Sequence, residues 1–72
     1  MPYIAKVMQE KQGRTVLERA FATLEEAKAC ISRHRSRHKY AKTHYVSRIT
    51  EYNASTIIRS YQFELNRWVC IG

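Results

Sequence analysis

The chain has 72 residues, 44% of them hydrophobic, with only two glycines and one proline. This composition is typical of a compact globule and excludes the polar, proline-rich character of a disordered segment. A domain of this size has one small core and little room for a walled-off catalytic site, so we expect a protein that is not an enzyme. Thirteen basic residues against six acidic ones give a formal net charge of +7.

The chain has no apolar stretch near the ~18 residues that a membrane span needs. Its N-terminal segment also lacks the apolar core of a secretory signal, so we expect a cytoplasmic protein with no membrane partner. In that compartment Cys30 and Cys70 are expected to be reduced thiols. No repeat or linker divides the chain, which predicts a single domain over residues 1–72.

The first two elements are predicted as strands. Residues 3–9 and 15–21 are rich in β-branched and aromatic side chains, and a polar break separates them. Gly13 in that break can adopt the positive φ that a tight loop requires. The pattern predicts an antiparallel hairpin.

A helix is predicted over residues 24–38. Thr23 and Glu26 have the spacing of a capping box, in which the threonine hydroxyl accepts from the Glu26 amide and the glutamate reaches back to the Thr23 amide. Residues at three- and four-residue steps then form one stripe, which we expect to face the core: Leu24, Ala27, Cys30, Ile31, His34 and His38.

The remaining sequence predicts a second hairpin, with strands over 44–52 and 56–65 and turn residues at 53–55. A further turn at 66–67 would allow a short last strand over 68–71. The predicted fold class is therefore α+β, in the order ββαββ(β), with one helix packed on one face of an antiparallel sheet. Alternation along the fourth strand predicts one face with Ile57, Arg59, Tyr61 and Phe63.

The basic character is confined to residues 27–50, which hold seven lysines and arginines and no acid, while the rest of the chain is balanced. Like charges four residues apart on a helix, such as Arg33 and Arg37, repel each other. A cluster of this kind favours a polyanionic partner, with DNA or RNA phosphates as the first candidates. The predicted nucleic-acid-binding residues are Lys28, Arg33, Arg35, Arg37, Lys39, Tyr40 and Lys42.

The leading hypothesis is a non-catalytic module that binds a phosphate backbone through the helix and the segment after it. The alternative is a protein-interaction module or a small inhibitor or regulator of the kind that mobile elements encode. It would use the basic patch against an acidic protein surface, or the uncovered sheet face against a partner or a second copy. The interface candidates on that reading are Tyr52, Tyr61, Phe63 and Trp68, because aromatic residues dominate interface hot spots.

No cofactor is expected. Cys30, His34 and His38 share the helix stripe and are weak candidates for zinc, but three ligands over two helical turns do not converge easily on one tetrahedral ion. Cys30 and His34 also form a nominal nucleophile and base pair. They are predicted to lie on the buried face of the helix, and the sequence offers no obvious oxyanion donor, which argues against catalysis.

Overall fold

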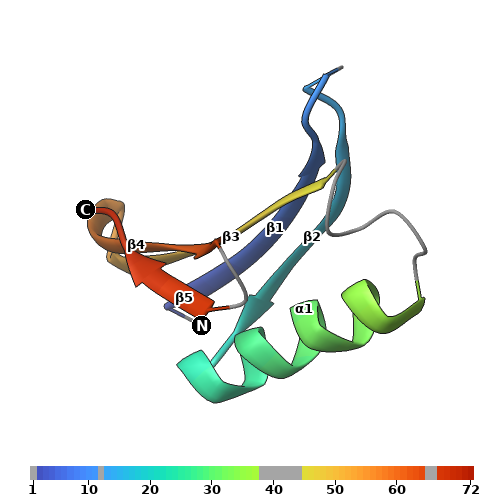
Figure 1. Cartoon of the computed structure of the whole chain (residues 1–72). Coiled ribbons are helices and arrows are strands. Elements are labelled where there is room, and N and C mark those ends of the chain that lie inside the picture. The colour runs from blue at the N-terminus through green and yellow to red at the C-terminus, as the bar shows by residue number, and fades with distance from the viewer. Residues whose placement is uncertain (1, 12, 38–44, 65–66) are drawn as a thin grey trace.

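Five strands and one helix form an α+β domain in the computed structural model, which describes residues 2–11, 13–37, 45–64 and 67–72 (Figure 1). The strands make one antiparallel sheet in the order β2-β1-β3-β4-β5, so that β3 lies beside β1. The elements are β1 (Tyr3–Gln9), β2 (Thr15–Phe21), α1 (Leu24–Arg37), β3 (Tyr45–Asn53), β4 (Thr56–Glu64) and β5 (Arg67–Cys70). The predicted fold class and element order, with the fifth strand, are confirmed.

The hairpin of β1 and β2 has the predicted bounds. Gly13 has a φ of 64°, in the left-handed region that glycine adopts without a steric penalty. The loop is closed by two backbone hydrogen bonds of 2.8 Å, from the Gln9 amide to the Arg14 carbonyl and from the Gly13 amide to the Gln9 carbonyl. The single internal glycine therefore stands where the turn needs it.

Helix α1 begins at the predicted cap. The Glu26 amide donates to Thr23 Oγ1 at 3.2 Å, and the Thr23 hydroxyl donates to Glu26 Oε1 at 3.0 Å. The Glu26 carboxylate therefore accepts from the Thr23 hydroxyl, whereas in a capping box it accepts from the Thr23 backbone amide. The described helix ends at Arg37, and the predicted last residue, His38, lies outside the described residues.

The core lies between α1 and the first three strands of the chain, which are the strands that the helix mainly packs against. Ile31 and Ala27 of the helix are fully buried against Val7 and Ala5 of β1 and Ile49 of β3. Cys30 is also buried, as its position in the predicted stripe requires. Strands β4 and β5 lie beyond the helix, so the helix does not cover their part of this sheet face.

One feature of the β3–β4 hairpin was not predicted. Glu51 pairs with Arg59, but the next residue, Tyr52, pairs with Ile57, so the register shifts by one residue at that point. The side-chain alternation of β4 is interrupted there because a bulge adds an unpaired residue. Ile57 consequently lies on the opposite face from Arg59, and the prediction that they share a face is wrong.

The two faces of the sheet are distinguished by whether the helix packs on them. The helix-side face is the one that α1 packs against, and the open face is the opposite one, which no described element covers. Within the parts of the chain that the structure describes, no helix has the length and apolar character for crossing a lipid bilayer. Both cysteines are free, with Cys30 buried and Cys70 exposed.

Candidate nucleic-acid interface

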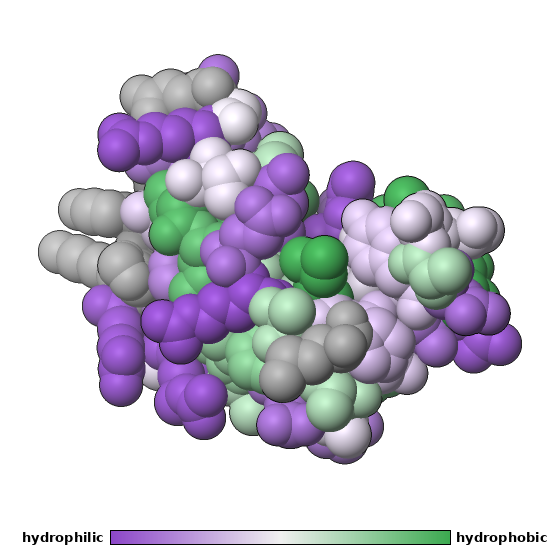
Figure 2. Space-filling view, turned by 180° about the vertical axis from the view of Figure 1, so that it is seen from behind, coloured by the Kyte–Doolittle hydropathy of each residue, from purple (hydrophilic) through white to green (hydrophobic). Residues whose placement is uncertain are grey.

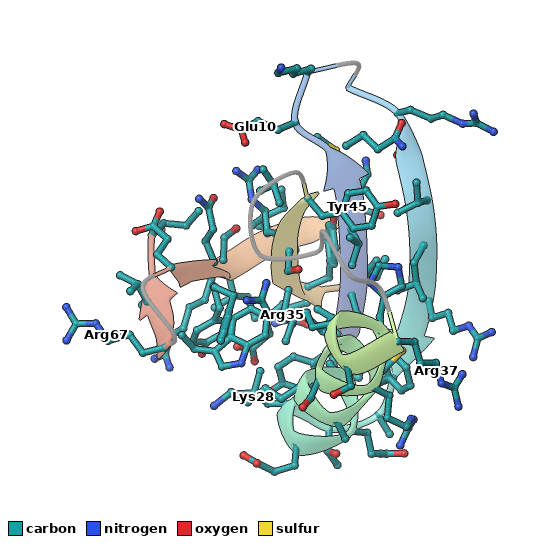
Figure 3. All side chains as sticks on the ribbon, turned by 45° about the vertical axis from the view of Figure 1, so that its right-hand side comes forward. Glu10, Lys28, Arg35, Arg37, Tyr45 and Arg67 are labelled. Carbon is teal, nitrogen blue, oxygen red and sulfur yellow. The ribbon has the colours of Figure 1, made fainter. Side chains whose placement is uncertain are left out.

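The basic residues of α1 lie on two sides of the helix. Lys28 and Arg35 are two turns apart and extend on the side that faces β4 and β5, whereas Arg37 extends on the opposite side (Figure 3). Lys28 and Arg35 are partly buried, while Arg33 and Arg37 are exposed. We call Lys28 and Arg35 the inner basic pair and Arg33 and Arg37 the outer basic pair.

Arg35 of the inner basic pair contacts an aromatic surface, which consists of Tyr61, Phe63 and Trp68 from β4 and β5. The Arg35 guanidinium carbon lies 4.1 Å from the centre of the Phe63 ring, which is cation–π geometry. The Phe63 and Trp68 rings are 5.3 Å apart and tilted by 53°. All three aromatic side chains are partly buried, and they continue the sheet face beside the helix.

A second group of polar residues lies further along the helix-side face. Tyr3, Glu51 and Arg59 are directly opposite one another on β1, β3 and β4. Desolvation, followed by the charge of Glu51, raises the pKa of Tyr3 above its usual value. The pKa of Arg59 is raised above its usual value, first by the hydrogen bond that its guanidinium donates to the Tyr61 oxygen and later by the charge of Glu51. The positive charge of Arg59 therefore has a carboxylate facing it.

Not every predicted binding residue can be placed. Lys39, Tyr40 and Lys42 lie outside the described residues. Arg48, the last cation of the basic segment, lies on β3 and lines the open face, away from α1. The described cations of the basic segment therefore lie on both sides of the sheet.

The four predicted interface residues do not form one surface. Tyr61, Phe63 and Trp68 lie on the helix-side face, where Tyr61 and Trp68 pack against the core. Tyr52 instead lines a hollow on the open face. The aromatic residues assigned to the uncovered face are thus mostly beside the helix, because the sheet is wider than the helix that packs on it.

Two of the three zinc candidates can be placed in the structure. Cys30 is buried in the core, and the His34 ring lies 5.5 Å from the ring of Tyr45, which itself packs against the core. His38 lies outside the described residues. Among the residues that are described, no group of three His, Cys, Asp or Glu side chains is arranged to hold a metal ion.

The cations of α1 could be identified as candidate binding residues from the sequence, but the position of Arg35 beside Phe63 could not. Arg35 and Phe63 are far apart in the chain, and no local pattern links them. The one available signal is the amphipathic strand 56–65, whose aromatic residues alternate with polar ones. No family model matches the chain, and no curated protein or solved structure matches it either.

Proposed function

We propose that the protein is a non-catalytic nucleic-acid-binding module. Its binding surface combines the inner basic pair, Lys28 and Arg35, with the aromatic surface of Tyr61, Phe63 and Trp68. The observation that carries the proposal is the contact between the Arg35 guanidinium and the Phe63 ring, because it joins a cation that has no ion pair among the described residues to an aromatic surface.

The charges of α1 support a phosphate partner. Glu25 and Glu26 occupy the first turn, where they complement the helix dipole, and every charged residue after them in the helix is basic. Lysine and arginine side chains that neutralise phosphates release condensed counterions, which gives affinity without base recognition. Binding of this kind decreases steeply as the salt concentration rises.

The aromatic surface favours unpaired bases over a duplex. Proteins that bind single strands combine a basic groove along the backbone with aromatic rings on which bases stack, and each stacked base contributes about 1–3 kcal/mol. In a duplex the faces of the bases are already stacked on each other, so Phe63 and Trp68 would have nothing to contact. The protein is therefore expected to bind single-stranded DNA or RNA more tightly than the matching duplex.

The fluorescence of Trp68 provides the test, because it is the single tryptophan in the sequence. The protein is titrated at low salt with a single-stranded oligonucleotide and with its duplex, and each titration is repeated at rising salt. We expect quenching by the single strand, weaker binding of the duplex, and an affinity that decreases with salt. Phe63→Leu should weaken single-strand binding and leave the salt dependence unchanged, since it removes a ring and no charge.

Two results would overturn the proposal. One is the absence of binding to either nucleic acid at low salt, measured by fluorescence and by gel retardation. The other is binding that Phe63→Leu and the charge variants of the inner basic pair leave unchanged, which would place the contact elsewhere.

A further inference from the structure

The open face has a polar row at its centre. Glu18, Lys6, Arg48 and Gln62 stand directly opposite one another on β2, β1, β3 and β4. Lys6 and Arg48 are therefore neighbouring cations on adjacent strands, with Cβ atoms about 5 Å apart. Like charges in this position destabilise a sheet.

The nearby acids do not pair with these two cations. The Arg48 guanidinium donates to the neutral amide oxygen of Gln62 at 3.0 Å, and the Gln62 amide in turn donates to Glu64 at 2.8 Å. Within the described parts of the chain, neither Lys6 nor Arg48 has a carboxylate at ion-pair distance. Glu18 stands opposite Lys6 on β2 and lines the same hollow, but Arg48 has only Lys6 and the neutral Gln62 opposite it, so the net charge of the row is positive.

Apolar side chains surround the two cations. Together they line a hollow of about 260 Å³ on the open face, whose apolar members are Ile4, Met8, Val46, Tyr52 and Ile57. Ile57 is 57% exposed, so its side chain is accessible to a partner. Figure 2, which shows the molecule from behind, displays hydrophobic side chains lying among hydrophilic ones.

We propose that the open face is a docking site for an amphipathic segment of a partner protein that carries acidic side chains. The apolar rim would receive the aliphatic side chains of that segment, and a carboxylate would enter between Lys6 and Arg48. Five strands spaced about 4.8 Å apart make a face wide enough for one helix of about 10 Å diameter. This proposal does not depend on the nucleic-acid-binding function.

Two other occupants fit the face less well. In a symmetric dimer the same patch meets itself, so an axis through the hollow would bring Lys6 and Arg48 against the same two cations of the second copy. A nucleic acid would find mostly aliphatic side chains there, with Tyr52 as the single aromatic side chain that lines the hollow. An acidic amphipathic segment satisfies both the charge and the apolar rim.

A display library of helical peptides is the probe for this site. Selection on the whole chain is followed by affinity measurements and by mapping of amide chemical shifts. We expect the enriched peptides to combine aliphatic and acidic residues and to shift the amides of β1 and β3. Lys6→Gln/Arg48→Gln should weaken their binding by roughly tenfold or more, since charged partners across an interface are strongly coupled.

The matched control is Arg33→Gln/Arg37→Gln, which removes the same charge from the outer side of α1 and should leave peptide binding intact. Ile57→Ser tests the apolar rim at an exposed position, where the fold does not depend on the side chain, and should also weaken binding. The proposal is overturned if no peptide is enriched, if the peptides lack acidic residues, or if both charge variants bind equally well. A concentration-dependent dimer that Lys6→Gln/Arg48→Gln abolishes would overturn it in favour of a second copy.

Discussion

Two double variants of α1 separate a located binding surface from general attraction by a basic protein. Lys28→Gln/Arg35→Gln and Arg33→Gln/Arg37→Gln each remove two positive charges from the same helix. The first pair extends on the side of β4 and β5, where Arg35 contacts Phe63, and the second lies on the outer side. If the nucleic acid lies along the aromatic surface, only the inner variant loses phosphate contacts.

The expected magnitude follows from counterion release. Each phosphate contact on a single strand contributes about 0.7 to the slope of log affinity against log salt, so two lost contacts reduce that slope by about 1.4. Between about 50 and 200 mM salt, the wild-type protein should then lose about sevenfold more affinity than the inner variant does. The outer variant should keep the wild-type slope.

The assay is fluorescence anisotropy of a labelled single-stranded oligonucleotide at four or five salt concentrations. Thermal unfolding of both variants shows whether the fold is retained. Loss of the Arg35–Phe63 contact should cost about 0.5–1 kcal/mol, and removal of the Arg33–Arg37 repulsion should be neutral or slightly stabilising. Equal reductions of affinity and of slope in the two variants would refute a located surface, because charge alone would then explain the binding.

Four further predictions concern the fold, each measured as the free energy of unfolding. Thr23→Ala should destabilise the protein by about 1 kcal/mol, because the helix loses its cap. Gly13→Ala should cost about 1–2 kcal/mol from its positive φ alone, since no atom lies within 4 Å of an added Cβ. Ser47→Ala should stabilise the protein by about 1 kcal/mol, because Ser47 is 1% exposed and its hydroxyl has no hydrogen-bond partner among the described residues; an unchanged or lower stability would contradict this. The raised pKa of Tyr3 implies stability that is present below pH ~10 and lost as the phenol ionises, so Tyr3→Phe should lose less stability at alkaline pH than the wild type.

The elements could be predicted from the sequence because their signals are local. Gly13 and the Thr23 cap each act over a few residues, and both stand where the structure uses them. The shift in register at Glu51 and Tyr52 has no comparable signal, since bulge formation depends on how β3 and β4 twist together. A single unpaired residue was enough to place Ile57 on the other face of the sheet.

The candidate site was predictable only in part, for a related reason. The spacing of Lys28 and Arg35 places them on one side of any helix, but nothing in the sequence indicates that this side faces Phe63. That outcome depends on the strand order, which puts β4 and β5 beyond the strands that α1 covers. A contact between residues so distant in sequence follows from tertiary packing and not from periodicity.

All cations contribute equally to the net charge of the sequence, but in the structure they have different neighbours. Arg59 has Glu51 opposite it on the neighbouring strand, so a phosphate would compete with an internal carboxylate for that charge. Arg35 has an aromatic ring beneath it, which stabilises the guanidinium without neutralising it. Its charge thus remains available to an anion while its position is restrained, so less side-chain entropy is lost on binding. This combination makes Arg35 the residue on which the proposed nucleic-acid contact should depend most strongly.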